Sequence, residues 1–293
     1  MKLTELVGNT PLVELSSIWR NPSVKIYGKL EGHNPGGSVK DRAAYGMLTG
    51  ALERGEIKRG DKLVEATSGN TGIALAMIAN TLGLKMTLIM PESATIERRK
   101  TMKAFGAELI LTPEEKTIEY SRTLAEEMAN SGEYYMLNQF GNPDNWKMHY
   151  RTTGPEIWKD TDGAVTHFVS SMGTTGTIMG VSRYLKEQNA NVQIVGTQPT
   201  EGSRIPGIRR WSPEFLPKIF EAHRVDRTID VSQDDAKKNA RRLAKEEAIF
   251  SGMSSGGALT AALKVASELE KGVIVFIVCD RGDRYLSSDL FEF

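Results

Sequence analysis

The sequence predicts an α/β protein built on parallel β-sheets, and three observations support this fold class. Short apolar runs that are typical of strands alternate with helical stretches along almost the whole chain. These runs are nearly continuous, as expected for strands that are buried on both faces of a sheet. Glycine-rich turns follow several of the runs and open the next helix. Alternation of this kind gives a parallel sheet with helices on both faces.

In the first half of the chain, the expected strands are short apolar runs, and the expected helices repeat apolar residues every three or four positions. The strands are expected at 25–30, 62–66, 86–90 and 107–111, and the helices at 38–52, 70–82, 96–105 and 116–130. Pro91 ends the third strand, because proline cannot donate a hydrogen bond to a neighbouring strand.

The second half repeats this rhythm. Strands are expected at 166–170, 192–196 and 273–278, and helices at 177–187, 234–247 and 257–270. The segment 204–220 contains three prolines and is expected to form an irregular loop. Since 293 residues suit one large domain or two intimate ones, we expect two α/β halves that divide near 142–153. No linker rich in proline, glycine and serine separates the halves, so they should pack closely.

The overall charge argues against several classes of function. Lys plus Arg and Asp plus Glu both number 37, so the formal net charge is zero. A nucleic-acid-binding protein usually has a basic excess, so we expect no nucleic-acid partner. The longest apolar run, 273–279, is far shorter than the ~20 residues of a membrane-spanning helix. The N-terminus also lacks the apolar core of a signal peptide, so we expect a cytoplasmic protein with no membrane partner.

The few residues that could form disulfides or bind metals are scattered. Cys279 is the only cysteine, so no internal disulfide can form. The four histidines show no metal-ligand spacing, so we expect no metal site.

The turn at 67–72, Thr-Ser-Gly-Asn-Thr-Gly, follows an expected strand and opens an expected helix. Hydroxyls, an amide and accessible backbone N–H groups at a helix N-terminus favour a bound carboxylate or phosphate. The alternative is a plain helix cap, because serine and asparagine are good capping residues. One such residue is enough for a cap, whereas this turn has four polar residues, which favours the ligand site over the plain cap.

The segment 173–177, Gly-Thr-Thr-Gly-Thr, is a second turn from strand to helix. Its glycines would let the backbone approach a ligand closely, so the turn is a candidate phosphate cup. The alternative is an ordinary tight turn. It lacks the lysine of a P-loop, and no G-x-G-x-x-G motif is present, so a nucleotide is not indicated.

The third segment, 34–42, places Lys40 in the first turn of an expected helix. The helix dipole is positive there and disfavours the ammonium form, which would favour a nucleophilic lysine that can bond to a carbonyl carbon. The alternative is a solvated surface lysine.

Together with 8–12, Gly-Asn-Thr-Pro-Leu, these three segments resemble the fold-type II pyridoxal-phosphate enzymes, and more narrowly the cysteine synthases, or O-acetylserine sulfhydrylases. The resemblance extends over nearly the whole chain. The segments 205–211, 250–257 and 279–286 are similar to the B-type members of this family. The implied fold is the two-domain architecture of the tryptophan synthase β-like enzymes.

The resemblance also implies domain bounds. The smaller, mobile domain that binds the substrate carboxylate would span 36–144, and residues 1–11 could cross over to it. The larger domain, which binds the cofactor phosphate, would span 12–35 and 145–293.

The implied cofactor is pyridoxal 5'-phosphate, and the family motifs assign its contacts. Lys40 would bond to the cofactor and later move the proton at the substrate Cα, Asn70 would contact the ring hydroxyl, and Ser254 the pyridine nitrogen. The phosphate would be bound by Gly173, Thr174, Thr175, Gly176 and Thr177, and the substrate carboxylate by Thr67, Ser68, Thr71 and Gln139.

The implied reaction is a β-replacement that forms L-cysteine from O-acetyl-L-serine and sulfide or thiosulfate, through an α-aminoacrylate. A neutral serine beside the pyridine nitrogen makes the ring a weaker electron sink than a carboxylate would, which favours early loss of the β-leaving group. Arg209 and Arg210 could border the entrance for an anionic sulfur donor. Cys279 could form a wall of the site, and the alternative is a buried, inert core thiol.

Other functions remain open at this point. O-Phosphoserine could replace O-acetylserine, with Arg204 and Arg209 as candidate phosphate contacts. A serine/threonine dehydratase-like β-eliminase, a cystathionine β-synthase or a catalytically silent regulator could share the fold, although the presence of Lys40 argues against the regulator. The resemblance also implies a homodimer and small-molecule substrates as the partners.

Overall fold

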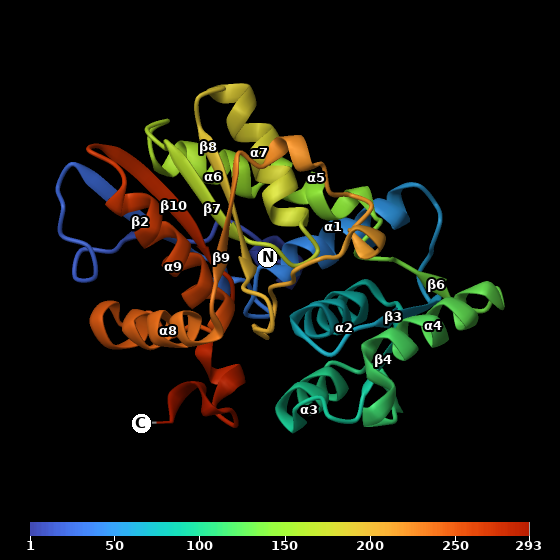
Figure 1. Ribbon diagram of the computed structural model, residues 1–293. Coiled ribbons are helices and arrows are strands. Elements are labelled where there is room, and N and C mark those ends of the chain that lie inside the picture. The colour runs from blue at the N-terminus through green and yellow to red at the C-terminus, as the bar shows by residue number, and fades with distance from the viewer. Residues whose placement is uncertain (293) are drawn as a thin grey trace. The chain divides into compact units, whose positions relative to one another are not determined.

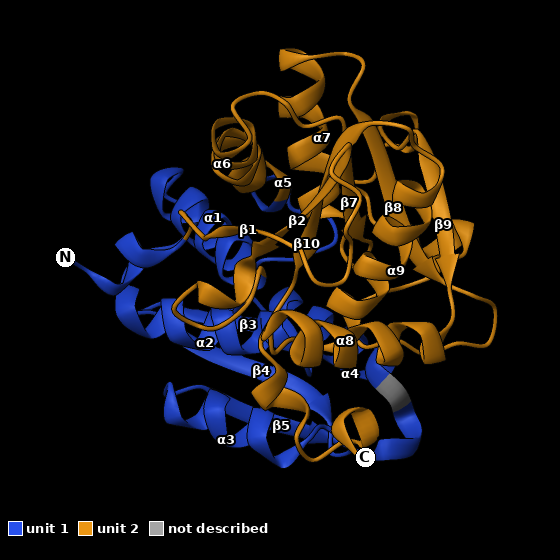
Figure 2. Cartoon of the chain, turned by 90° about the vertical axis from the view of Figure 1, so that its left-hand side faces the viewer, with its two compact units in different colours: residues 1–7, 40–145 blue, residues 8–39, 146–293 orange. Residues whose placement is uncertain are grey.

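The computed structural model describes residues 1–292, apart from the side chain of Thr117. The chain forms two compact units, each with its own sheet (Figure 2). Unit 1 contains residues 1–7 and 40–145, and unit 2 contains residues 8–39 and 146–293.

Unit 1 is built on a four-stranded parallel sheet with the order β5-β4-β3-β6. The strands are β3 (Lys62–Ala66), β4 (Lys85–Pro91), β5 (Glu108–Thr112) and β6 (Tyr135–Met136). The helices are α1 (Lys40–Glu53), α2 (Asn70–Leu82), α3 (Ile96–Ala104) and α4 (Thr117–Asn130). A short 3-10 helix, Leu3–Leu6, also belongs to this unit.

Successive residues of β3 point to opposite faces of this sheet, and helices cover both faces. Leu63 packs in one apolar cluster with residues of α1 and α2. Val64 packs in the other cluster, with Ala125 of α4. Burial on both faces explains why the strands of this unit read as continuous apolar runs.

Unit 2 is built on a six-stranded sheet with the order β1-β2-β10-β7-β8-β9. Figure 1 labels the strands from β2 to β9 of this sheet, and Figure 2 also labels β1. The strands are β1 (Leu12–Glu14), β2 (Val24–Leu30), β7 (His167–Ser171), β8 (Gln193–Pro199), β9 (Arg227–Val231) and β10 (Gly272–Val278). The helices are α6 (Thr153–Asp160), α7 (Gly176–Gln188), α8 (Gln233–Glu247) and α9 (Met253–Ser267). Helix α5 (Pro143–Arg151) begins in unit 1 and ends in unit 2.

The central strand β10 shows how this sheet is buried. Ile274 and Phe276 pack with residues of α8 and α9. Val275 and Ile277 point the opposite way and pack with residues of α6 and α7. The two helical layers therefore cover opposite faces of the sheet, and in sheets of this kind ligands bind where strands lead into helices.

The predicted α/β class is confirmed, with one correction to the topology. Strand β1 pairs antiparallel with β2, so the larger sheet is not wholly parallel. The sequence reading also missed several elements: β1, β6, β9, α5 and α6. Strands β1 and β6 are very short, and β9 alternates polar and apolar residues at the edge of the sheet. None of the three therefore shows the continuous apolar run by which the other strands were predicted.

Two helix starts differ from the expected ones by more than one residue. Helix α9 begins at Met253 and not at 257, although serine and glycine are weak helix formers. Close packing of this segment against α8 outweighs that preference. Helix α1 begins at Lys40 and not at 38.

The observed division also differs slightly from the expected bounds. Residues 8–11 and 36–39 group with unit 2. The backbone N–H of Leu30 donates to the Pro11 carbonyl, and the N–H of Val39 donates to the carbonyl of Cys279. These bonds attach both segments to the larger sheet. Within the described residues, no helix has the length and apolar content needed to span a membrane.

Candidate active site

The turn between β7 and α7 has the features of an anion cradle within unit 2. Thr175 adopts a left-handed backbone conformation, with φ +71°, which is unfavourable for threonine. Its buried Oγ1 has no hydrogen-bond partner among the described residues. The turn also leads into the N-terminus of α7, where backbone N–H groups and the helix dipole favour an anion. The turn therefore combines backbone strain with an unsatisfied hydroxyl at a point suited to a phosphate.

The loop 205–211 lies against the start of this turn. The indole Nε1 of Trp211 donates to the Gly173 carbonyl at 2.8 Å, and the backbone N–H of Arg209 donates to the Met172 carbonyl at 2.8 Å. A Cβ at Gly173 would lie only 2.7 Å from the carbonyl oxygen of Gly207, so only glycine fits there. The proline-containing loop is irregular, as expected, but it is held firmly in place.

Ser254 lies beside this loop. It belongs to the first turn of α9 and is 4% exposed, and its carbonyl accepts a hydrogen bond from Ser171 Oγ at 2.8 Å. A Cβ on Gly207 would lie 3.4 Å from the Ser254 Cβ. Unit 2 therefore brings the 173–177 turn, Gly207 and Ser254 together, although they are far apart in the sequence.

Cys279 lies close to the same region. It follows β10, is half-buried, and its N–H donates to the Ser255 hydroxyl at 2.9 Å. Its carbonyl accepts from the N–H of Val39, the residue that precedes Lys40 in the chain. The cysteine is thus next to the Ser254 turn, and its role as a wall of the site stays a prediction.

The neighbouring arginines of the loop 205–211 differ in their bonding. Arg210 donates to the Pro199 carbonyl at 2.8 Å and pairs with Asp230 at 2.5 Å. Gln198, and then Arg210, hold the pKa of the Asp230 carboxyl below its ordinary value. The exposed side chain of Arg209 makes no hydrogen bond or ion pair to the described residues. This geometry favours Arg209 over Arg210 as a contact for an anionic substrate.

His149 contributes to the site region without any signal in the sequence. It is 1% exposed, its Nε2 lies 3.3 Å from Thr177 Oγ1, and its Nδ1 lies 2.8 Å from Thr153 Oγ1. These contacts bring together α5, α6 and α7, and none belongs to a short motif. His149 therefore anchors the threonine that closes the turn 173–177.

In unit 1, the turn 67–72 leads directly into the N-terminus of α2. The N-cap residue of the helix is Gly69, and no side chain caps it. Thr67 Oγ1 accepts a long hydrogen bond of 3.4 Å from the Gly69 N–H. The plain-cap alternative is therefore disfavoured, because a glycine occupies the N-cap position in place of Ser68 or Asn70.

The same unit brings together two residues that were assigned to the substrate carboxylate. Thr71 Oγ1 donates to Gln139 Oε1 at 2.9 Å, and both side chains are buried. They come from α2 and from the segment after β6, 68 residues apart. A hydrogen bond of 2.8 Å from the side-chain Nδ2 of Asn145 to the backbone carbonyl of Gln139 fixes this segment further.

Lys40 is the first residue of α1, and Asn70 is the first residue of α2. Both are half-buried, and the two helices pack against each other in unit 1. The structure therefore bears out the expected position of Lys40 in the first turn of a helix.

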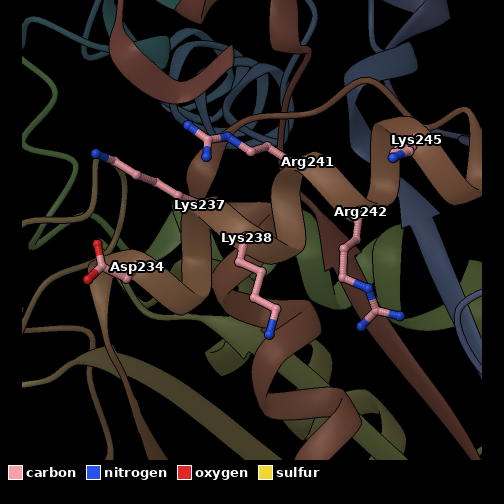
Figure 3. Close-up of a pocket in the computed structure, with 6 residues that line it drawn as sticks. All are labelled: Asp234, Lys237, Lys238, Arg241, Arg242 and Lys245. Atoms are coloured by element: carbon pink, nitrogen blue, oxygen red, sulfur yellow. The ribbon is translucent and has the colours of Figure 1, made fainter. Parts of the chain in front are cut away.

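A separate hollow of about 470 Å³ runs along α8 in unit 2 (Figure 3). It is lined by Asp234, Lys237, Lys238, Arg241, Arg242 and Lys245. Lys237 pairs with Asp289, Arg242 pairs with Glu246, and Arg241 donates to backbone carbonyls. The hollow shares no residue with the predicted site, and we interpret it as the solvated outer face of α8.

Comparisons with known proteins agree with this geometry. The chain is 59% identical over 290 residues to cysteine synthase B of Pseudomonas aeruginosa, covering 99% of this chain and 97% of that protein. It is 58% identical to cysteine synthase B of Escherichia coli, covering 99% of this chain and 95% of that protein. A crystal structure of cysteine synthase from Entamoeba histolytica matches with a TM-score of 0.94 and 41% identity, covering 100% of this chain and 90% of that one.

A family model also matches most of the chain. The model described as pyridoxal-phosphate dependent enzyme matches residues 3–280, which include the candidate site residues of unit 1 and of unit 2. This chain therefore belongs to the pyridoxal-phosphate-dependent enzymes.

Proposed function

We propose that this chain is a cysteine synthase, which forms L-cysteine from O-acetyl-L-serine and a sulfur nucleophile with pyridoxal 5'-phosphate as cofactor. The family match and the cysteine synthase B relatives, at 58–59% identity over 99% of the chain, support the activity and the cofactor. The structural observation that carries the proposal is the 173–177 turn, with its strained Thr175 and unsatisfied hydroxyl, next to Ser254.

The residues present fit the cofactor. Gly173, Thr174, Thr175, Gly176 and Thr177 would bind the phosphate, and the buried Thr175 hydroxyl would gain the partner that it lacks. Ser254 would contact the pyridine nitrogen, Asn70 the ring hydroxyl, and the Lys40 amine would bond to the cofactor. When bound, the cofactor supplies an electron sink for negative charge at the substrate Cα.

The remaining steps belong to this chain's own residues. Thr67, Ser68, Thr71 and Gln139 would bind and orient the substrate carboxylate. The freed amine of Lys40 would take the Cα proton while acetate leaves from Cβ. A sulfur nucleophile would then form the bond to Cβ, and Lys40 would return a proton to Cα. Burial of Thr71 and Gln139 would limit the access of water to the carboxylate subsite.

The test is direct. The purified chain is supplied with pyridoxal 5'-phosphate, O-acetylserine and sulfide, and the products are measured. We expect free cysteine and acetate in equal amounts. Faster turnover with O-phosphoserine than with O-acetylserine would show that O-phosphoserine is the preferred amino-acid substrate. Pyruvate and ammonia formed in place of cysteine would indicate a β-eliminase, and absence of all of these products would overturn the enzyme assignment.

The contrast between the two arginines gives a prediction about the sulfur donor. Arg209→Ala is expected to raise the KM for thiosulfate about tenfold and to change the KM for sulfide less than twofold, because thiosulfate is the larger anion and a charge-assisted hydrogen bond is lost. Arg210→Ala is the matched control, since its guanidinium is already bonded to Asp230. Equal effects of Arg209→Ala on both donors would exclude selective recognition by this side chain.

We also propose a cytoplasmic homodimer, on the basis of the family resemblance. Sedimentation equilibrium of the holoenzyme is expected to give twice the chain mass of 32.3 kDa. A mass equal to that of one chain would contradict the dimer.

A further inference from the structure

Glu65 is a buried carboxylate immediately before the turn 67–72. It belongs to β3, is 4% exposed, and both of its oxygens accept backbone hydrogen bonds. Oε2 accepts from the Asn138 N–H at 3.0 Å, and Oε1 accepts from the Gln139 N–H at 3.2 Å. One side chain therefore holds two consecutive backbone N–H groups of the segment that follows β6.

These two bonds hold a turn with an uncommon backbone conformation. Asn138 is left-handed, with φ +56°, which asparagine adopts more readily than most other non-glycine residues. The next residue, Gln139, accepts the Thr71 hydroxyl bond through its side-chain oxygen. Glu65 is thus connected through the backbone of 138–139 to the two side chains that we assign to the substrate carboxylate.

The hydrogen bonds to Glu65 suit its ionised form, because a carboxylate offers an acceptor on each oxygen. Burial nonetheless raises the pKa of this carboxyl to about 7, although the two backbone N–H bonds and the Arg122 guanidinium oppose the increase. Arg122 and Glu126 of α4 are the charged groups that line a small cavity with Glu65. The guanidinium of Arg122 also lies 4.9 Å from the centre of the Phe140 ring.

We propose that Glu65 is a positioning residue for recognition of the substrate carboxylate. Its ionised side chain holds the backbone of 138–139, and thereby fixes the Gln139 amide against Thr71. Protonation weakens one of the two bonds and loosens the subsite. The inference rests on the proposed function, because it assigns the carboxylate to Thr71 and Gln139.

The test compares Glu65→Gln with the wild-type holoenzyme. A glutamine has one acceptor oxygen, so one backbone N–H loses its partner while the shape of the side chain is kept. We expect the KM for O-acetylserine at pH 8 to rise about tenfold and kcat to change less than twofold. In the wild type, we expect KM to rise about tenfold between pH 8 and pH 6 as Glu65 becomes protonated, and this rise should disappear in Glu65→Gln.

Glu126→Gln is the matched control, because Glu126 lines the same small cavity but is exposed and bonds to neither N–H group. It should leave both KM and its pH dependence unchanged. Glu65→Asp keeps the charge and should keep the pH dependence of KM. If Glu65→Gln does not fold, the pH profiles of the wild type and Glu126→Gln carry the test, and a wild-type KM that stays constant between pH 8 and pH 6 would overturn the positioning role. A purely structural role would lower stability without removing the pH dependence of KM.

A second measurement separates this inference from the proposed function. Hydrogen exchange of the peptide 136–142, corrected for intrinsic exchange rates, should be at least about tenfold less protected in Glu65→Gln than in the wild type. Reduced protection without any cysteine synthesis by the wild type would overturn the proposed function and, with it, the carboxylate role. Unchanged protection, or a wild-type pH dependence of KM that persists in Glu65→Gln, would overturn the positioning role itself.

Discussion

Replacing Lys40 with alanine is expected to lower kcat/KM for cysteine formation by at least about 10³-fold, because general acid–base and nucleophilic roles would be lost together. The lysine begins α1, at the position where the family motif of 34–42 places the cofactor-binding amine. Steady-state assays with O-acetylserine and sulfide measure the effect.

An independent readout identifies the lysine itself. Borohydride reduction of the wild-type holoenzyme should attach the cofactor permanently, and mass spectrometry should find the added mass on the peptide that contains Lys40. Lys100→Ala, which removes an exposed lysine of α3, is the control and should keep full activity. Cofactor mass found on another lysine would contradict the assignment.

Overpacking in Gly256→Ala is expected to destabilise unit 2 by about 3 kcal/mol. The higher helix propensity of alanine offsets only about 1 kcal/mol of this loss. A Cβ at Gly256 would overlap the backbone carbonyl oxygen of Ala236 in α8. Backbone atoms cannot move aside as a side chain can, so α8 and α9 would be forced apart. Because Ser254 lies two residues earlier, the affinity for pyridoxal 5'-phosphate should weaken as well.

The neighbouring glycine is the matched control. At Gly257 a Cβ would meet the tip of the Ile208 side chain at 2.8 Å, and that flexible group can turn away. Thermal unfolding and cofactor titration of Gly256→Ala and Gly257→Ala should therefore differ clearly. Equal unfolding temperatures would show that the close approach of α8 and α9 is not needed for stability.

The sequence was informative wherever one segment was sufficient to define a feature. Strand β3 and helix α2 begin and end at the predicted residues, because a compact apolar run and a helix of small residues give strong local signals. The turns 67–72 and 173–177 were found for the same reason, since a glycine-rich turn between strand and helix is a local pattern.

Features that depend on distant partners were not predictable in this way. The unsatisfied hydroxyl of Thr175 and the burial of His149 arise from tertiary packing. Glu65 looked like an ordinary strand residue until its two backbone partners, 73 and 74 residues away, were known. The different bonding of Arg209 and Arg210 also has no signature in an Arg-Arg pair.

The pairing of β2 with β10 has a consequence for folding during synthesis. These strands are neighbours in register from Val24 to Leu30, yet β10 begins only at Gly272. Strand β2 can therefore pair with β10 only after almost the entire chain has been synthesised. Most of unit 1 is one continuous stretch, which the ribosome completes much earlier. We expect nascent chains that end before β10 to hold a folded unit 1 while one edge of β2 still lacks its partner strand, and to depend on chaperones until the last strand emerges.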